Sequence, residues 1–527
     1  MKRLLASIIL IITGTGAAFA QGAQQTFAES VNEFMAPISE VISDIIFFAL
    51  PMDWLVAGAP GIPFIALWLV GGAIFFTFYM GFPNIRGFKQ SIRIVKGTYD
   101  NPNDPGEVTH FQALTAAVSG TVGLGNIAGV AIAVSIGGPG ATFWMILAGF
   151  FGMTSKFVEC TLGVKYREID ENGVVTGGPM LYLSKGLAQH GLPNLGKILA
   201  IAAAVICIGG AYGAGAMFQV NQSSTQFTNE LVALTGGAES FFFGRPWLFG
   251  ILFAGVVGLV IIGGIRQITH VTEFLVPIMA TIYISASLVV IFSHFTEIPA
   301  AFGQIFAGAF TGEGVQGGII GVLIQGLRRA SFSNEAGLGS AAIAHSAAKT
   351  KEPVAEGLVA LLEPFIDTVV ICTITALVII LTGTFDANAS GTSAGIALTS
   401  KAFGSVIDWF PYILTVAVVL FAFSTSITWF YYGQRSFLYL FGNNVPADFA
   451  FKLSYLGILV IGSAMSLGPV MDMADALLLA MGFPNIIGLI IMRKEVKSML
   501  ENYLKRVKSG EIKPYIHDES EGGKLPQ

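Results

Sequence analysis

The chain has 527 residues, of which 54% are hydrophobic and 12% are charged, and its formal net charge is −5. Soluble domains carry about a quarter charged residues, so this composition excludes an ordinary soluble domain and predicts an all-α polytopic membrane protein. The three cysteines lie in apolar stretches without CxxC spacing, which excludes a disulfide scaffold, and no basic run outside a short C-terminal tail suits nucleic acid.

The first twenty residues have the form of a secretory signal peptide. Two basic residues open the chain, an apolar core follows over residues 4–12, and an A-x-A cleavage site ends at Ala20. Because this core is shorter than the roughly 20 residues that a membrane span needs, cleavage is favoured over an uncleaved anchor helix. Residues 21–59 would then form a periplasmic N-terminal segment.

Eleven apolar runs are long enough to cross the bilayer as helices. The first covers residues 60–82, and residues 108–155 hold two spans with a Gly-Gly-Pro-Gly turn at 137–140. The other eight runs, of which 315–348 is interrupted by charges, cover residues 198–229, 247–265, 274–296, 315–348, 368–385, 409–434, 453–471 and 476–492.

The charges of the connecting loops predict an orientation. If the mature N-terminus lies outside and the spans alternate, basic residues gather in the loops that fall inside, and only Arg245 and Lys401 fall outside. The pattern predicts a multi-pass protein of a bacterial inner membrane with a cytoplasmic tail over residues 493–527. The basic tail is read as a topology signal, with contact to anionic lipid as a second reading.

The chain contains a weak internal repeat. One Gly-Leu-Gly segment, 123–125, lies in the second span and another, 337–339, lies in the seventh. Because five spans separate the copies, they run in opposite directions, as in the inverted repeats of many secondary carriers. The pattern predicts two five-span repeats over residues 108–296 and 312–492, preceded by one additional transmembrane helix over residues 60–82.

Each Gly-Leu-Gly segment predicts a helix that is broken near mid-membrane, since glycine at alternate positions weakens a helix. Freed backbone groups are tolerated there only where they are buried in protein or line a cavity. Freed amides suit a carboxylate, and freed carbonyls suit Na⁺ or an ammonium group. A single Gly-x-Gly would be read as a packing surface, but two copies in inverted halves favour broken helices.

Polar side chains in two further spans are candidates for a binding site. Phe218 and Gln222 lie four residues apart on one helix face and could bracket a small zwitterion, or the amide could bond another helix. Thr425 and Trp429 are also four apart. The hydroxyls of Ser424 and Thr425 could join freed carbonyls in an oxygen cage for a hard cation, or they could bond their own helix.

Charged residues near the spans leave further alternatives open. Glu335 and Asn334 lie at the second break, where the carboxylate could gate the path or pair with one of the two arginines that precede it. Lys156 and Glu159, three residues apart, are expected to pair locally. Two acidic residues, Glu363 and Asp367, flank the start of the eighth span and are expected at the membrane interface.

Seven segments spread over residues 110–440 form a specific set: GNIAGVA at 125–131, GPGATFWM at 138–145, KFVE at 156–159, GPM at 178–180, LRRASFSNEAGLGS at 327–340, FAFST at 421–425 and WFYYG at 429–433. Together they resemble the alanine or glycine:cation symporter family, also called sodium:alanine symporters. The resemblance implies the leucine-transporter-type fold, with ten core helices in two inverted repeats. It also implies co-transport of alanine or glycine with Na⁺, sometimes H⁺, without a cofactor or an obligate protein partner.

The resemblance also implies site residues. Substrate contacts would come from the first, third and eighth core helices, at Thr121, Gly123, Gly125, Asn126, Phe218, Gln222, Thr425 and Trp429. A sodium site would use the hydroxyls of Ser424 and Thr425, with backbone carbonyls near Val122 and Gly125. The chain departs from the family at 341–343 and 426–428, and because both segments lie near the implied pocket, substrate size stays open.

The sequence as a whole predicts a secondary active transporter that takes up a small neutral amino acid with Na⁺ by alternating access. An H⁺-coupled amino-acid carrier is the alternative, and a channel-like pore is a further one, because broken helices also line channels. A membrane enzyme would need a catalytic dyad or a metal cluster within a span, and the sequence offers neither pattern.

Overall fold

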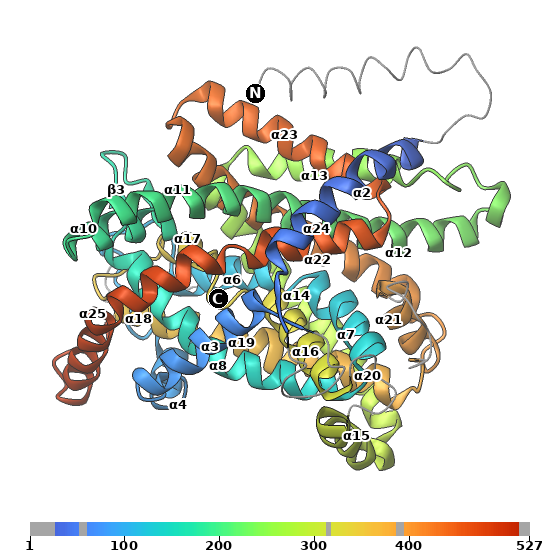
Figure 1. Ribbon diagram of the computed structural model, residues 1–527, viewed down its shortest axis with the longest axis horizontal. Coiled ribbons are helices and arrows are strands. Elements are labelled where there is room, and N and C mark those ends of the chain that lie inside the picture. Colours follow the sequence, from blue (N-terminus) through green and yellow to red (C-terminus); the bar gives the residue numbers. More distant parts are fainter. Residues whose placement is uncertain (1–26, 52–60, 312–317, 386–394, 516–527) are drawn as a thin grey trace, which may run out of the picture.

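Helices form nearly all of the structure, a computed structural model that describes residues 27–51, 61–311, 318–385 and 395–515 (Figure 1). The expected signal peptide lies outside the described residues, as does part of the 21–59 segment. Two short antiparallel hairpins join helices: β1 (Ala49–Leu50) with β2 (Ile62–Pro63), and β3 (Glu168–Ile169) with β4 (Val175–Thr176). The predicted all-α class is confirmed.

The first half of the chain forms the helices that hold the first break. In chain order they are α2 (Phe27–Ile46), α3 (Phe64–Tyr79), α4 (Pro83–Arg86), α5 (Phe88–Val95), α6 (His110–Thr121), η2 (Gly125–Gly129), α7 (Val130–Gly137), α8 (Gly140–Lys165), α9 (Pro179–Leu181), η3 (Tyr182–Gly186), α10 (Leu187–Gln189), α11 (Pro193–Gly210), η4 (Ala211–Met217), α12 (Phe218–Leu234), η5 (Gly237–Glu239), α13 (Pro246–Ile261) and α14 (Gly264–Ser293).

The second half holds the second break. Its helices are η6 (Phe295–Glu297), α15 (Ile298–Thr311), α16 (Gly318–Asn334), α17 (Ala341–His345), α18 (Pro353–Ala360), α19 (Leu362–Pro364), η7 (Phe365–Cys372), α20 (Thr373–Leu381), α21 (Gly395–Gly404), α22 (Phe410–Phe441), α23 (Val445–Ala464), α24 (Leu467–Leu479) and α25 (Gly482–Lys508).

Seven helical stretches of the described chain are long and apolar enough to cross a membrane, or eight if the bent pair α6 and η2–α7 is one span. Two shorter apolar helices, α3 and α13, have 16 residues each. At 1.5 Å per residue, such a helix is about 24 Å long, a little less than the hydrocarbon core. The broken α16–α17 segment is not among these stretches, so the count of eleven spans stays a prediction.

The last two helices do not coincide with the predicted runs at 453–471 and 476–492. The chain forms α23 over Val445–Ala464 and then a nearly continuous stretch over Leu467–Lys508. The predicted runs were bounded by charged residues, but two such residues lie inside helices. Lys452 pairs with Asp448 within α23, and Asp472 of α24 pairs with Arg328 of α16.

Two packed groups of helices meet at the first break. Helix α8 packs against α3, α15, α16, α17 and α18, while α22 packs against α6, α11, α12 and α14. The first broken helix belongs to both groups, because α6 packs on α22 and α17, and α7 packs on α8 and α16. This arrangement puts the backbone of the break at a boundary between two bodies of helices.

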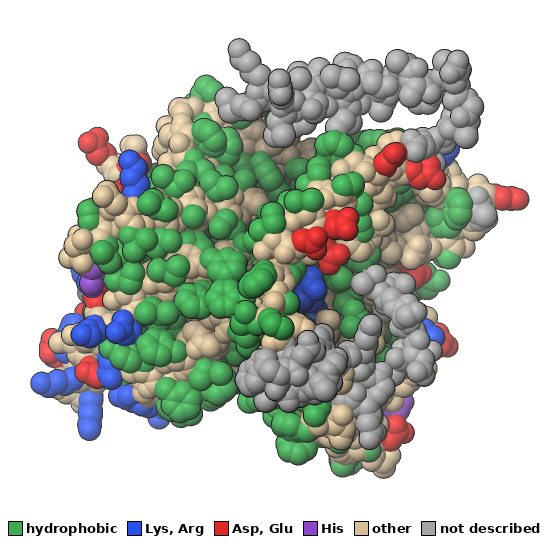
Figure 2. All heavy atoms as spheres, viewed as in Figure 1, with side chains coloured by type: hydrophobic (Ala, Val, Ile, Leu, Met, Phe, Trp, Pro, Cys, Tyr) green, Lys and Arg blue, Asp and Glu red, His purple; other side chains and the backbone are tan. Residues whose placement is uncertain are grey.

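The surface has the character of a membrane protein. Figure 2 shows hydrophobic side chains over much of the visible face, with Lys and Arg gathered near the end of α25. Exposed apolar residues recur along α13 and α14, among them Leu252, Leu259, Phe274 and Ile278. A water-soluble protein would bury such side chains, whereas lipid tails solvate them.

Candidate functional site

The first break interrupts the helix directly after Thr121. Helices α6 and η2–α7 are bent by 49° relative to one another, and Val122 leaves the helical region with ψ of 88°. Side chains satisfy the freed amides: Gly123 N donates to Asn126 Oδ1 at 2.9 Å, and Leu124 N donates to Gln219 Oε1 at 3.1 Å. The predicted break is therefore present, with its backbone buried in protein.

The second break separates α16 from α17. Glu335, Gly337 and Gly339 have positive φ angles of 56°, 86° and 84°, which non-glycine residues rarely adopt. Asn485 Nδ2 donates to the freed Gly337 carbonyl at 2.8 Å, and Gly339 N donates to Glu159 Oε2 at 3.0 Å. Glycine at 337 and 339 is thus required by the backbone, as the repeat suggested.

Glu335 projects from the second break into the protein interior and is 2% exposed. Its carboxylate accepts hydrogen bonds from Ser340 Oγ at 2.5 Å and Trp429 Nε1 at 3.0 Å. The arginines that precede it pair elsewhere, because Arg328 and Arg329 both contact Asp475. Of the two alternatives for Glu335, the pairing with an arginine is not formed, and the carboxylate instead joins the break to Trp429 of α22.

A fully buried carboxylate, Asp367, links the two breaks. Asn126 Nδ2 donates to its Oδ1 at 2.5 Å, and Ser333 Oγ and Thr368 Oγ1 donate to its Oδ2 at 2.8 and 2.6 Å. Asn334 Nδ2 donates in turn to Thr368 Oγ1 at 3.0 Å. Asp367 lies in η7, a π-helical segment of the kind that often marks functional sites.

The structure brings several of the expected substrate residues together. A Cβ atom at Gly123 would lie 2.5 Å from Thr425 Oγ1, and one at Gly125 would lie 3.4 Å from the Phe332 ring. The rings of Phe218 and Phe332 meet edge to face at 5.1 Å. Because these two positions are glycine, Thr425 of α22 packs directly on the backbone at 123, and the Phe332 ring packs on the backbone at 125.

Three other expected substrate residues make their hydrogen bonds outside this cluster. The Thr121 hydroxyl bonds carbonyls of its own helix, those of Ala117 and Val118. Gln222 accepts from Ile396 N at 3.1 Å, beneath α21, and Trp429 reaches the second break through Glu335.

The two hydroxyls expected to bind sodium point in different directions. Thr425 Oγ1 donates to the Ser119 carbonyl at 2.8 Å, one turn before the first break. Ser424 Oγ bonds the Phe421 carbonyl of its own helix at 3.0 Å and faces Met279 Sδ at 3.7 Å. Of the pair, Thr425 contacts the broken helix directly.

Two expectations about charged side chains are wrong. Glu363 and Asp367 are 0% exposed rather than interfacial. Lys156 Nζ pairs with Glu363 Oε2 at 2.9 Å, whereas Glu159 bonds the second break. The available signal was the largely apolar sequence around Glu363 and Asp367, which makes an ionisable residue a functional candidate.

Two cavities lie at opposite ends of α22. One of about 400 Å³ is lined by residues of α12, α21 and the start of α22, including Gln226, Glu230 and Lys401. The other, of about 840 Å³, includes Glu168, Lys185 and Arg435. Helix α21 covers the first break between them, where Thr399 Oγ1 donates to the Ile127 carbonyl at 3.1 Å.

Comparison with solved structures shows the fold. A crystal structure of MhsT in complex with L-phenylalanine superposes with a TM-score of 0.51 at 14% identity, covering 75% of this chain and 99% of that one. The architecture is the predicted leucine-transporter-type fold. At this level of identity, the likeness concerns the fold alone.

Comparison with known sequences shows the family. The sodium/alanine symporter AgcS of Methanococcus maripaludis is 39% identical over 437 residues, which are 83% of this chain and 93% of AgcS. The amino-acid carrier protein AlsT of Bacillus subtilis is 33% identical over 444 residues, 84% of this chain and 90% of AlsT. The model of the sodium:alanine symporter family matches residues 52–518. This chain therefore belongs to the sodium:alanine symporter family, whose members are membrane transporters.

Proposed function

We propose that this chain is a sodium-coupled symporter that takes up a small neutral amino acid by alternating access. The observation that carries the proposal is Asp367, a 0% exposed carboxylate between the two helix breaks. Membership of a sodium:alanine symporter family and similarity to AgcS support the choice of ion and substrate class.

A carboxyl group buried in a membrane protein needs either a positive partner or a bound proton. No described Lys or Arg side chain forms an ion pair with Asp367, whose neighbours are the neutral groups of Asn126, Ser333 and Thr368. Carboxylate, hydroxyl and amide oxygens are the ligands that a hard cation prefers. With their hydrogens turned away, the Ser333 and Thr368 hydroxyls would hold one Na⁺ together with the Asp367 carboxylate, while Asn126 keeps its Nδ2 on Asp367 and its Oδ1 on Gly123 N. The Thr425 hydroxyl with Val122 and Gly125 carbonyls remains a second candidate cage.

The amino acid would bind beside this ion. Its carboxylate would face the backbone amides of Gly123 and Leu124 once Asn126 and Gln219 release them. Thr425 and the Phe332 ring pack closely on Gly123 and Gly125, so a ligand would reach the backbone only as these groups move apart. The Phe218 and Phe332 rings would limit the side chain to a small apolar group. Gln222 and Trp429, which bound this region on either side, would contact the ligand only after a local movement.

Alternating access would expose the site to the two cavities in turn. Release of the Thr399 contact with Ile127 would open one side, and separation of α6 from α22 would open the other. Glu335 and Asn334, at the second break, would act as gating residues by holding Trp429 and Thr368 in place. The proposed orientation puts the mature N-terminus outside and the C-terminus in the cytoplasm of a bacterial cell.

Proteoliposomes that contain the purified protein test the proposal. An inward Na⁺ gradient should drive saturable uptake of labelled alanine, and dissipation of the gradient should abolish accumulation. Uptake that ignores Na⁺ but follows an imposed H⁺ gradient would favour the proton-coupled alternative, and uptake that does not saturate would favour a pore.

The substitution Asp367→Asn tests the carboxylate. It removes the charge but keeps the shape, so Na⁺-dependent accumulation should be lost while the protein still folds and elutes as a single species. Asp408→Asn is the matched control, because Asp408 is exposed near the start of α22. Unchanged Na⁺ dependence in Asp367→Asn would overturn the role given to this carboxylate.

A further inference from the structure

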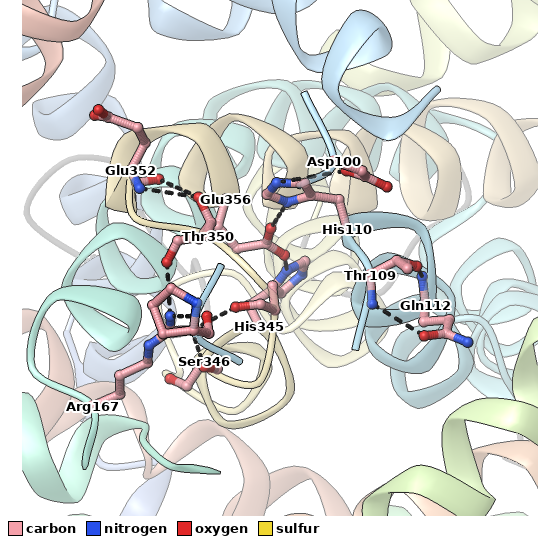
Figure 3. A network of polar contacts seen from close by, with 12 residues as sticks. Asp100, Thr109, His110, Gln112, Arg167, His345, Ser346, Thr350, Glu352 and Glu356 are labelled. Atoms are coloured by element: carbon pink, nitrogen blue, oxygen red, sulfur yellow. Dashed lines mark hydrogen bonds and ion pairs between the residues drawn. The ribbon is translucent and has the colours of Figure 1, made fainter. Parts of the chain in front are cut away.

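A line of buried ionisable side chains begins at the start of α6, away from Asp367 (Figure 3). Glu356 lies between two imidazole rings: its Oε2 contacts His110 Nδ1, and its Oε1 lies 2.5 Å from His345 Nδ1. The other ring nitrogen of His110, Nε2, faces Asp100 Oδ1 at 4.0 Å. One end of the line therefore meets solvent, since the Asp100 side chain is 26% exposed.

The line continues toward the second break. His345 Nε2 lies 3.5 Å from Glu363 Oε1, and Glu363 Oε2 lies 2.9 Å from Lys156 Nζ. His345, Glu363 and Lys156 are 0% exposed, and one turn along α8 from Lys156 the Glu159 carboxylate accepts from Gly339 N. Ionisable groups thus connect the surface at Asp100 with the backbone of the second break.

Apart from Asp100, the charges of this line balance in more than one protonation state. Glu159 alone offsets Lys156 when Glu356 and Glu363 are protonated and both histidines are neutral. Glu159, Glu356 and Glu363 offset Lys156 together with both histidines when both rings are cationic. Unpaired charge is costly at this depth, so the ionisation of each group depends on the others. The charged groups on surrounding elements are Glu335 at the second break, Glu107 before α6, the Arg506–Glu352 pair, and Arg167, which donates to the carbonyls of Pro105, Ser346, Ala348 and Thr350.

We propose that Asp100, His110, Glu356, His345 and Glu363 form a proton pathway, and that each transport cycle moves a proton between the surface at Asp100 and the Lys156–Glu363 pair. An imidazole that faces a carboxylate on both ring nitrogens can accept a proton at one nitrogen and release one from the other. Both histidines have this arrangement. Chains of Asp, Glu and His inside a membrane protein commonly serve as proton relays.

The transfers balance at each atom. The relay starts with neutral rings and a protonated Glu356. His345 gives its Nε2 proton to Glu363 Oε1 and takes a proton at Nδ1 from Glu356 Oε1, while Glu356 Oε2 takes the Nδ1 proton of His110. His110 Nε2 then takes a proton from Asp100 Oδ1, so one proton moves from Asp100 to Glu363. The 3.5 Å step between His345 and Glu363 lacks hydrogen-bond geometry. It joins α17, the half-helix after the second break, to α19, so movement of α17 during the cycle would close or open the path.

The pathway rests on the proposed function, and one experiment separates the two. Proteoliposomes with a trapped pH dye and a clamped membrane potential receive an inward Na⁺ gradient and labelled alanine, and uptake and internal pH are followed together. Alanine uptake with a simultaneous pH change of either sign supports the pathway. Uptake without a pH change overturns it but leaves the symporter intact, whereas absence of uptake is a failure of the proposed function.

Substitutions then locate the pathway. His345→Gln and Glu356→Gln keep hydrogen-bonding capacity but cannot relay a proton, so both should lose most of the alanine-dependent pH change and of net uptake. Exchange of labelled for unlabelled alanine at equal ion concentrations, which needs no net proton movement, should persist and verifies that each variant is folded. His270→Gln, an exposed histidine of α14, is the control. Unchanged proton movement in His345→Gln would overturn the pathway.

Discussion

At the scale of single residues, two glycines of the first break have opposite surroundings although both are buried. Gly123 faces Thr425 Oγ1 at 2.5 Å and Gln219 Oε1 at 3.1 Å, measured from an ideal Cβ. Gly129, at the end of η2, has nothing within 4 Å of such an atom. Gly129 lies in the family segment at 125–131 and Gly123 lies just before it, but only packing shows which of them contacts α22.

This difference predicts unequal effects of one methyl group. Gly123→Ala should abolish Na⁺-driven alanine uptake, because the methyl group forces Thr425 and the break apart at a cost of about 1–3 kcal/mol. Gly129→Ala should retain uptake, since its methyl group meets open space. Initial rates in proteoliposomes measure both, and equal rates for the two variants would contradict the packing described at Gly123.

At the scale of elements, α8 and α15 approach so closely that only glycine fits at their crossing. A Cβ atom at Gly140, the first residue of α8, would overlap the backbone of Gly308 and Ala309 in α15. Trp144 Nε1 also donates to the Ala309 carbonyl at 3.2 Å. In the family segment at 138–145, Gly140 and Trp144 thus contact helix α15 and are not placed at the substrate site.

The crossing predicts a stability difference between two Gly→Ala variants. Gly140→Ala should lower the Tm of the detergent-solubilised protein. The new methyl group would overlap backbone atoms of Gly308 and Ala309, which cannot move aside as a flexible side chain can. Gly303→Ala, on α15 with nothing within 4 Å, should keep or raise the Tm, since alanine is the better helix former by about 1 kcal/mol. A loss of Tm in Gly303→Ala alone would contradict the α8–α15 geometry.

At the scale of the whole molecule, the distribution of charge makes the proposed orientation in the membrane testable. The exposed basic residues of α25, including Lys505 and Lys508, lie at one end of the molecule, and Lys401 lies on α21 at the other end of α22. Cys160, Cys207 and Cys372 are all buried, so the natural chain offers little background to a thiol probe.

Single cysteines therefore test the orientation. In intact cells, a membrane-impermeant maleimide should label Lys401→Cys, whereas Lys508→Cys should react only after permeabilisation. The unsubstituted protein is the control for background labelling. Labelling of Lys508→Cys from outside would reverse the proposed topology, and with it the side of the membrane on which the Asp100 end of the proton pathway opens.

The amino-acid sequence by itself determined the membrane class, the places of the two helix breaks and the family. Those properties depend on local composition and on glycine. Gly337 and Gly339 adopt positive φ angles, a backbone conformation that glycine tolerates and other residues rarely adopt. Of the expected site residues, Gly123 contacts both Asn126 and Thr425 at the first break, while the binding roles given to these residues stay predictions.

Only the tertiary structure decided which ionisable residues are buried and with whom they pair. Asp367 joins the breaks, Lys156 binds Glu363 rather than Glu159, and Glu356 lies between two histidines that are far apart in the sequence. The environment of a charge depends on neighbours from other helices, and helical periodicity says nothing about which helix those neighbours come from. The length and composition of each apolar run are local properties, whereas the partner of a buried charge is a property of the folded molecule.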